Sequence, residues 1–242
     1  MHLTTRRVAA LVGALTLTLG VGACSKSEPT PGSATASAST TTAQAPKAAE
    51  ILAKAKSNAL GAKSGSFAGE VTENGQTMKI DFKGTDDGTT SDITIDMAAE
   101  GKVHLISVGG TVYMQGDAAF WKAQGAPAEM QSAGDKFIKA PAGEDDLTKE
   151  LTISNFLAEA FNEVTPDKVS EKVGSEKLNG VDCWVLVDKK GKEEGSLYVS
   201  KDKFELVRFT GSTDSPGQID FSSWNKDLGI EAPKADQIMD IS

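Results

Sequence analysis

The thiols and imidazoles of this sequence are few: Cys24, Cys183 and His104, with the other histidine at position 2. They are the first candidates for nucleophile, base or metal ligand. Cys183 lies in an apolar run, residues 181–187, where burial would raise the pKa of its thiol. We therefore expect a small buried hydrophobe at this position, with a reactive thiol as the alternative. One thiol and one histidine in the body of the chain exclude a His-rich zinc site.

His104 stands between Val103 and Leu105, in a segment that reads as a strand. A Ser-His-Asp or Cys-His arrangement through His104 stays open on the sequence alone, but no serine occupies a Gly-x-Ser-x-Gly turn. The acidic residues 144–146 are adjacent without EF-hand spacing, which favours a solvated loop over a metal site. The sequence therefore indicates a protein that is not an enzyme and that holds no cofactor and no metal.

The chemistry expected at Cys24 is acylation. A short basic segment with Arg6 and Arg7 precedes an apolar run over residues 8–23, which is the layout of a secretory signal. That run is diluted by glycine and threonine and is shorter than the roughly 20 apolar residues of a spanning helix. Its end, Val21-Gly22-Ala23-Cys24, resembles a bacterial lipobox. This resemblance implies removal of the signal peptide, residues 1–23, and attachment of diacylglycerol and palmitate to Cys24; the alternative is an ordinary core cysteine.

The net charge of the chain limits the kinds of molecule that it is expected to bind. Residues 1–23 contain two arginines and no acid, so 23 basic and 34 acidic residues remain, a net charge near −11. An acidic chain argues against nucleic acid, which binds to basic surfaces. It also argues against electrostatic attraction to anionic headgroups, so the lipid is the expected anchor. We expect the protein on the extracytoplasmic face of the cell membrane, without a disulfide because only one thiol stays free.

Composition divides the remaining chain in two. Residues 24–47, the lipidated cysteine and a Ser/Thr/Ala/Pro-rich stretch, contain no large apolar side chain, so we expect a disordered linker. As a flexible coil it would reach roughly 25–30 Å. Its composition is also compatible with O-glycosylation, and an unmodified tether is equally consistent. Residues 48–242 are long enough for one folded domain.

Within this domain the spacing of apolar residues is typical of a helix in some segments and of a strand in others. Residues 48–60 and 148–163 show helical spacing, and residues 117–146 are irregular. Asn74-Gly75 and Asn179-Gly180 are hairpin signals. Period-two runs predict strands at residues 67–71, 78–82, 93–97, 103–108, 111–115, 169–173, 181–188, 196–200, 204–210 and 218–222. The sequence therefore predicts an α+β fold in which one antiparallel sheet carries helices on one side.

Three segments of this domain resemble segments of a known protein family. They are residues 183–187, residues 195–200 with 204–208, and residues 221–224 with 230–233. Together with the lipobox, the linker and the strand–helix–strand order, they resemble the actinobacterial LppX/LprG lipoproteins, which are built like the lipoprotein carrier LolA. The resemblance implies a curved half-barrel sheet, covered by helices on its concave side, whose apolar cavity binds or carries lipid or glycolipid acyl chains. The alternative is a non-enzymatic surface lipoprotein that acts as sensor or scaffold through contacts with unknown proteins.

The apolar members of the alternating runs are the candidate residues lining such a cavity, and the second helix would be its lid. Alternating apolar residues also fill a packed core, so both interpretations stay open. The candidates are Phe67, Met78, Ile80, Phe82, Ile93, Ile95, Leu105, Val112, Phe156, Leu157, Phe161, Val185, Leu197, Leu206 and Phe221.

Replacing Cys24 by alanine should release or misprocess the protein, because two or more acyl chains hold a protein stably at a membrane and none would be attached. The measurement is fractionation of cells with the intact mass of the product. A variant that still partitions fully with membranes at the mature mass would contradict the lipobox interpretation.

Overall fold

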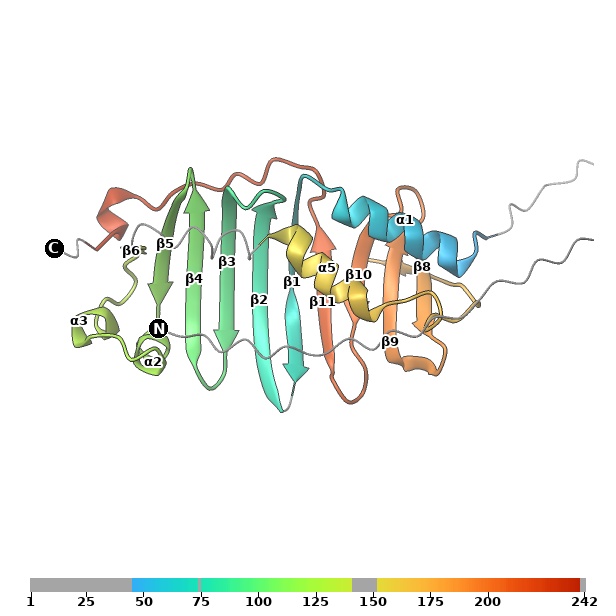
Figure 1. Cartoon of the computed structure of the whole chain (residues 1–242), viewed down its shortest axis with the longest axis horizontal. Helices are drawn as coiled ribbons and strands as arrows, with labels where there is room; N and C mark the ends of the chain where they lie inside the picture. Colours follow the sequence, from blue (N-terminus) through green and yellow to red (C-terminus); the bar gives the residue numbers. More distant parts are fainter. Residues whose placement is uncertain (1–44, 74, 141–151, 240–242) are drawn as a thin grey trace, which may run out of the picture. The chain divides into compact units, whose positions relative to one another are not determined.

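The computed structural model describes residues 45–73, 75–140 and 152–239 (Figure 1). The chain divides into two compact units, Met1–Ala43 and Gln44–Ser242, and the described residues belong to the second. The predicted signal peptide and the lipidated cysteine lie outside the described residues. None of the described helices is long and apolar enough to cross a membrane.

A single antiparallel sheet forms the framework of the second unit. Its described strands follow the order β6-β5-β4-β3-β2-β1-β11-β10-β9-β8-β7, so the edge strands β6 and β7 do not pair and the curved sheet stays open. This confirms the predicted curved antiparallel sheet with helices. The strands are β1 (Ser64–Glu73), β2 (Gln76–Thr85), β3 (Thr90–Met97), β4 (Gly101–Val108), β5 (Thr111–Gly116), β6 (Ile138–Lys139), β7 (Gly174–Leu178), β8 (Val181–Asp188), β9 (Gly191–Ser200), β10 (Leu206–Thr210) and β11 (Gly217–Ser222).

Two-residue turns set the register of the hairpins. Leu178 pairs with Val181 across Asn179-Gly180, whose φ angles of 50° and 84° are those of a type I′ turn. This register corrects one predicted strand. We expected a strand at residues 169–173, but a two-residue turn pairs the five residues directly before it, so β7 is Gly174–Leu178 and Val169 makes only an isolated bridge to Asp188.

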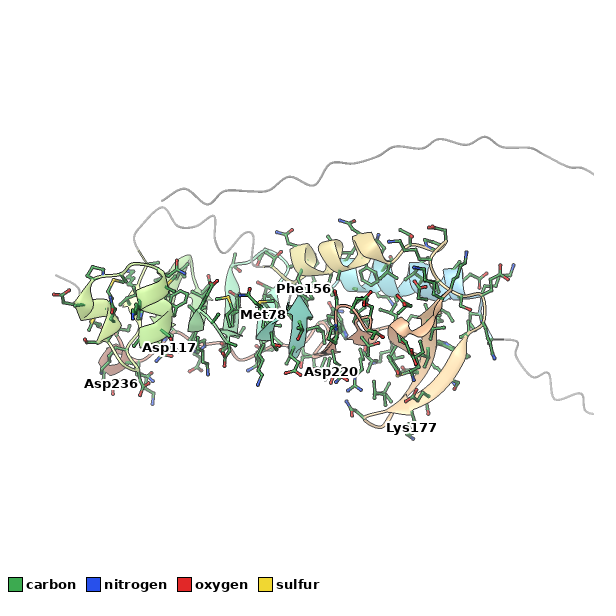
Figure 2. The ribbon with its side chains drawn as sticks, turned by 90° about the horizontal axis from the view of Figure 1, so that it is seen from below. Met78, Asp117, Phe156, Lys177, Asp220 and Asp236 are labelled. Carbon is green, nitrogen blue, oxygen red and sulfur yellow. The ribbon has the colours of Figure 1, made fainter. Side chains whose placement is uncertain are left out.

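Side-chain alternation gives the sheet two chemically different faces. Helices α1 (Ala48–Leu60) and α5 (Ile153–Glu163) lie on one of them, which we call the helix face; Figure 2 shows Asp220 on the opposite, outer face. The outer face of β2–β4 carries charged side chains such as Lys79, Asp92 and Lys102. The helix face of β1–β5 carries no charged side chain over residues 65–71, 78–84, 91–97, 101–107 and 112–116. The residues that point to this face are Gly65, Phe67, Gly69, Val71, Met78, Ile80, Phe82, Gly84, Ser91, Ile93, Ile95, Met97, Gly101, Val103, Leu105, Ser107, Val112, Met114 and Gly116.

Each of the two long helices buries one row of apolar side chains, which we call a stripe, against the helix face. The bounds of α1 agree with the predicted helix, and it buries Ile51, Leu52, Ala55 and Ala59. Helix α5 begins at Thr152, whose hydroxyl accepts a hydrogen bond from the Asn155 backbone N–H at 3.1 Å. Of the predicted helix 148–163, residues 148–151 lie outside the described residues. The core also contains a stack of rings on Phe67, which has its ring centroid 4.7 Å from that of Phe82 and 4.0 Å from that of Phe156.

Two short helices, α2 (Ala118–Ala123) and α3 (Ala128–Gln131), form in the segment predicted to be irregular. The carboxylate of Asp117 caps α2 by accepting a hydrogen bond from the Phe120 N–H at 2.7 Å. Gly116 admits this helix, because a Cβ there would overlap the Phe120 ring. The C-terminal segment, which ends in a 3₁₀ turn (Ala235–Gln237), runs along the strand ends to β6, where Met239 N–H donates to the Phe137 carbonyl at 2.7 Å (Figure 1).

Replacing Phe67 by alanine should lower the free energy of unfolding by about 3–5 kcal/mol, because Phe67 is 2 % exposed and no neighbour can fill the space of its ring. Urea unfolding followed by tryptophan fluorescence measures this loss. Lys79→Ala, on the exposed outer face of β2, should stay within about 0.5 kcal/mol. Equal effects of the two substitutions would contradict the placement of Phe67.

Candidate functional site

An open groove of about 710 Å³ lies on the helix face beside α5. Helix α5 forms one wall, and β8–β11 with the end of β1 form the floor; we call this site the α5 groove. Its polar lining residues stand mainly at the strand ends and in the loop from Gly211 to Gly217. Its apolar lining residues are Val71, Phe156, Ala160, Val164, Val169, Leu186, Val187, Leu197, Phe209 and Ile219.

Two neighbouring stripes of α5 have different roles. Ile153, Leu157 and Phe161, spaced four residues apart, are at most 2 % exposed and belong to the core. Phe156, Ala160 and Val164 follow the same spacing on the adjacent stripe, are half-buried, and line the groove. Because an apolar helix surface of this width spans two stripes, α5 seals the core with one stripe and borders the groove with the other.

Glycine forms the middle of the floor. Gly195, Gly211 and Gly217 lie two residues from Leu197, Phe209 and Ile219, so they occupy the next helix-face row of β9, β10 and β11. Gly211 and Gly217 face each other across β10 and β11, with the Gly211 N–H donating to the Gly217 carbonyl at 2.9 Å. A Cβ on Gly211 or Gly217 would collide with the Ser215 or Glu70 carbonyl oxygen, so these glycines let neighbouring backbone approach closely at the floor of the groove.

The same row continues beyond the groove as apolar side chains. Gly217 pairs with Val71 on β1, Val71 with Met78 on β2, and Met78 with Met97 on β3. Val71, Met78 and Met97 are half-buried, as are Ile80 and Ile95 in the next row. The α5 groove therefore opens onto the uncharged helix face of β1–β3.

The predicted lining residues separate into several groups. Phe156 and Leu197 line the groove, and Leu197 is also a member of the buried core. Seven others belong to the core and do not line the groove: Phe67, Phe82, Ile93, Leu157, Phe161, Leu206 and Phe221. Met78, Ile80, Ile95 and Leu105 are half-buried on the helix face beside the groove, and Val112 is buried at β5. Most of the predicted set therefore packs the core beneath the helices, and the groove lies over β8–β11 instead.

Val185 is a correction. The alternation in β8 places Leu186 toward the helices, so Val185 faces outward and packs with Cys183 and Tyr198 in a separate cluster on the outer face. The prediction for Val185 was wrong because both alternating sets of β8 are apolar, and the sequence does not show which set faces the helices. Cys183 is fully buried there, and burial raises the pKa of its thiol, as expected from the apolar run.

The sequence interpretation missed the glycine row and the second stripe of α5. Ala160, Val164, Phe209 and Ile219 are ordinary apolar residues, so nothing in their types distinguishes groove from core. Gly195, Gly211 and Gly217 did carry a signal, because a glycine within or beside a strand often marks a place where a ligand or another backbone approaches closely. Their alignment in one row becomes visible only when the strands are paired.

Charged groups stand at the rim of the groove and not within it. Lys168 and Glu194 are exposed lining residues, and Asp188 is half-buried at the end of β8. The Thr72 hydroxyl at the β1 end is hydrogen-bonded to the hydroxyl of Thr77 at 2.8 Å. The site is thus an apolar trough with a polar rim, which suits a ligand with an apolar body and a polar end.

The titratable groups named in the sequence lie away from the groove. His104, on β4, has its Nε2 2.7 Å from Asp92 Oδ1, and its ring lies edge-on to Phe137. The hydrogen bond from His104 lowers the pKa of the Asp92 carboxyl, and partial burial opposes this shift. Cys183 lies on β8, at the other end of the sheet, so these two groups do not form a Cys-His pair. No cluster of three metal-ligating side chains occurs among the described residues.

Comparison with known proteins gives structural likeness alone. No protein-family model and no curated protein matches the chain. Among solved structures it is similar to LprF from Mycobacterium bovis, with 12% identity over 76% of this chain and 95% of that chain and a TM-score of 0.47. It is also similar to an uncharacterized conserved protein from Thermus thermophilus, with 11% identity over 78% of this chain and 96% of that chain and a TM-score of 0.34. LprF is a lipoprotein of the LppX/LprG family that the sequence resembles.

Replacing Asp92 by asparagine should lower the free energy of unfolding at pH 7 by at most about 1 kcal/mol, because both side chains of the His104–Asp92 pair are partly exposed. A carboxyl with a lowered pKa stabilises the fold above its ordinary value of 3.8 and stops doing so as the pH falls through its folded-state value. Urea unfolding of both proteins between pH 7 and pH 2 should therefore show the difference shrinking below pH 4. Asp96→Asn, exposed on the same strand, is the control; a loss of the same size there, or one that does not change with pH, would contradict the pairing.

Proposed function

We propose that this protein binds the acyl chain of a lipid in the α5 groove, while lipid on Cys24 anchors it to the extracytoplasmic face of a membrane. The observation that carries the proposal is the open groove of about 710 Å³ on the helix face, which lies between an apolar stripe of α5 and apolar side chains of the sheet.

The size and chemistry of the groove suit an acyl chain. Its volume of about 710 Å³ falls within the roughly 300–1,000 Å³ of small-molecule sites. Each methylene moved from water to such a surface contributes about 0.8 kcal/mol, so affinity needs no charged partner inside the trough. The polar rim at Asp188 and Glu194 leaves the headgroup in water or against hydroxyl and amide groups.

The groove favours binding over catalysis. Its lining residues include serine and threonine but no histidine and no cysteine, so the groove contains neither a Ser-His nor a Cys-His pair. The one described histidine pairs with Asp92 on the outer face. A carrier or receptor that holds a lipid without changing it fits this arrangement.

The anchor and the linker supply the remaining part of the proposal. Residues 24–47 precede α1 directly, and a flexible tether of this length has a root-mean-square reach of roughly 25–30 Å, which keeps the domain near the bilayer. At that distance a lipid can pass between membrane and groove without the protein leaving the surface. Lipid that co-purifies with the protein, identified by native mass spectrometry, tests the proposal directly.

Replacing Ala160 by tryptophan should fill the groove from its helix wall and weaken binding of a fluorescent long-chain fatty acid at least tenfold. Ala160 is half-buried and lines the groove, so an indole there occupies the volume that the ligand would take. Thermal melting should stay close to that of the unchanged protein, because the substitution removes no core contact.

Ala158→Trp is the matched control, since Ala158 is exposed on the same helix. This variant should bind the fatty acid as the unchanged protein does. Equal binding by both variants, or no binding by the unchanged protein, would contradict acyl-chain binding and favour a scaffold that works through protein contacts.

A further inference from the structure

The methionines of the chain are confined to one half of the sheet. Apart from Met1, they are Met78, Met97, Met114, Met130 and Met239. The first three occupy the helix face of β2, β3 and β5, and the other two pack against the cluster of Val103, Phe120, Trp121 and Ile138. The core under α1, by contrast, is built from leucine, isoleucine, valine, alanine and aromatic residues. All five methionines are half-buried, so each side chain is partly in contact with solvent.

Met78 and Met97 form a pair in the row that continues the groove floor. They are directly opposite each other on β2 and β3, and Met78 is also opposite Val71, which lines the groove. Figure 2 labels Met78 and Phe156 near the middle of the sheet. The pair lies near strand ends, beside the exposed residues 98–100 of the β3–β4 turn. The pair is therefore partly exposed and lies next to the groove, since Met78 is paired with the lining residue Val71.

We propose that Met78 and Met97 are oxidation sites through which a peroxide turns off lipid binding; this inference rests on the proposed function. Each thioether sulfur takes one oxygen atom from hydrogen peroxide and becomes a sulfoxide, and the peroxide is reduced to water. The sulfur loses two electrons in the step, and no other group of the protein takes part. An extracytoplasmic protein meets such oxidants before they reach the cytoplasm.

The chemistry of the surrounding face makes the change effective. A sulfoxide oxygen is a strong hydrogen-bond acceptor, while Val71, Ile80 and Ile95 around the pair offer no side-chain donor. Covering the oxidised pair with an acyl chain would leave these acceptors without a partner, at the cost of burying an unsatisfied polar group. Binding should therefore weaken by about tenfold to a hundredfold, while the strands keep their backbone pairing.

The other sulfur atoms of the described residues are placed differently. Met114, Met130 and Met239 pack around Trp121 and Ile138, next to α2 and not in the row that borders the groove. Cys183 is fully buried on the outer face, and burial raises the pKa of its thiol, so little thiolate is present to react with peroxide. Oxidation at these positions would leave the groove and its extension apolar.

The test uses the whole lipidated protein and a fluorescent long-chain fatty acid as the probe. The unchanged protein is titrated before and after hydrogen peroxide, and peptide mass spectrometry locates the added oxygen. The variant Met78→Leu/Met97→Leu keeps the volume and apolar character of the pair without an oxidisable sulfur. Met130→Leu/Met239→Leu is the control, because it removes two other methionines of the same half.

The expected result is that peroxide weakens probe binding at least tenfold in the unchanged protein and in the control, while the Met78/Met97 variant binds equally before and after. Binding lost in that variant too, or lost while Met78 and Met97 stay unoxidised, would overturn the inference and leave the proposed function standing. An unchanged protein that binds no probe before peroxide is added would overturn the proposed function, and the inference with it.

Discussion

The packing of α5 against Phe67 is the contact on which the rest of the domain depends. Phe156 stacks on Phe67 at 4.0 Å and Phe67 on Phe82 at 4.7 Å, which sets the height of the helix above β1 and β2. Ile153 holds the N-terminal end of the helix close to the sheet, because Gly65 beneath it has no side chain. Held in this way by aromatic rings, α5 cannot sink onto the glycine row of β9–β11, and the space below its second stripe stays open.

Glycine therefore has two uses on one face of the sheet. At Gly65 and Gly116 the missing side chain admits an apolar side chain from a helix, and the layer between helix and sheet closes. At Gly211 and Gly217 the missing side chain admits neighbouring backbone, because a Cβ there would collide with the Ser215 or Glu70 carbonyl oxygen. Interiors normally pack to the density of organic crystals, so the open apolar groove beside α5 is a feature that binding can use.

The charge of the protein is separated from this apolar layer. The outer face and the strand ends carry the acids and lysines, while the helix face of β1–β5 is uncharged where the helices lie over it or beside it. The uncharged face suits an apolar ligand, because burial of apolar surface needs no charged partner. Met78, Met97 and Met114 on that face add adaptable, polarisable contacts, together with a sensitivity to oxidation that leucine would not have.

The sequence by itself determined the framework of this protein. Period-two runs and the Asn179-Gly180 turn predicted an antiparallel sheet, α1 was predicted with its observed bounds, and the apolar run around Cys183 predicted a buried thiol. These features are local, because turn chemistry and hydrophobic period act within a few residues. Only the tertiary structure decided which apolar residues pack and which line a groove. Leu186 and Val185 are neighbours of the same type that face opposite sides, and Gly195, Gly211 and Gly217 form one row only after three strands pair and a helix is held above them. A cavity is an absence created jointly by distant segments, so no single segment of the sequence encodes it.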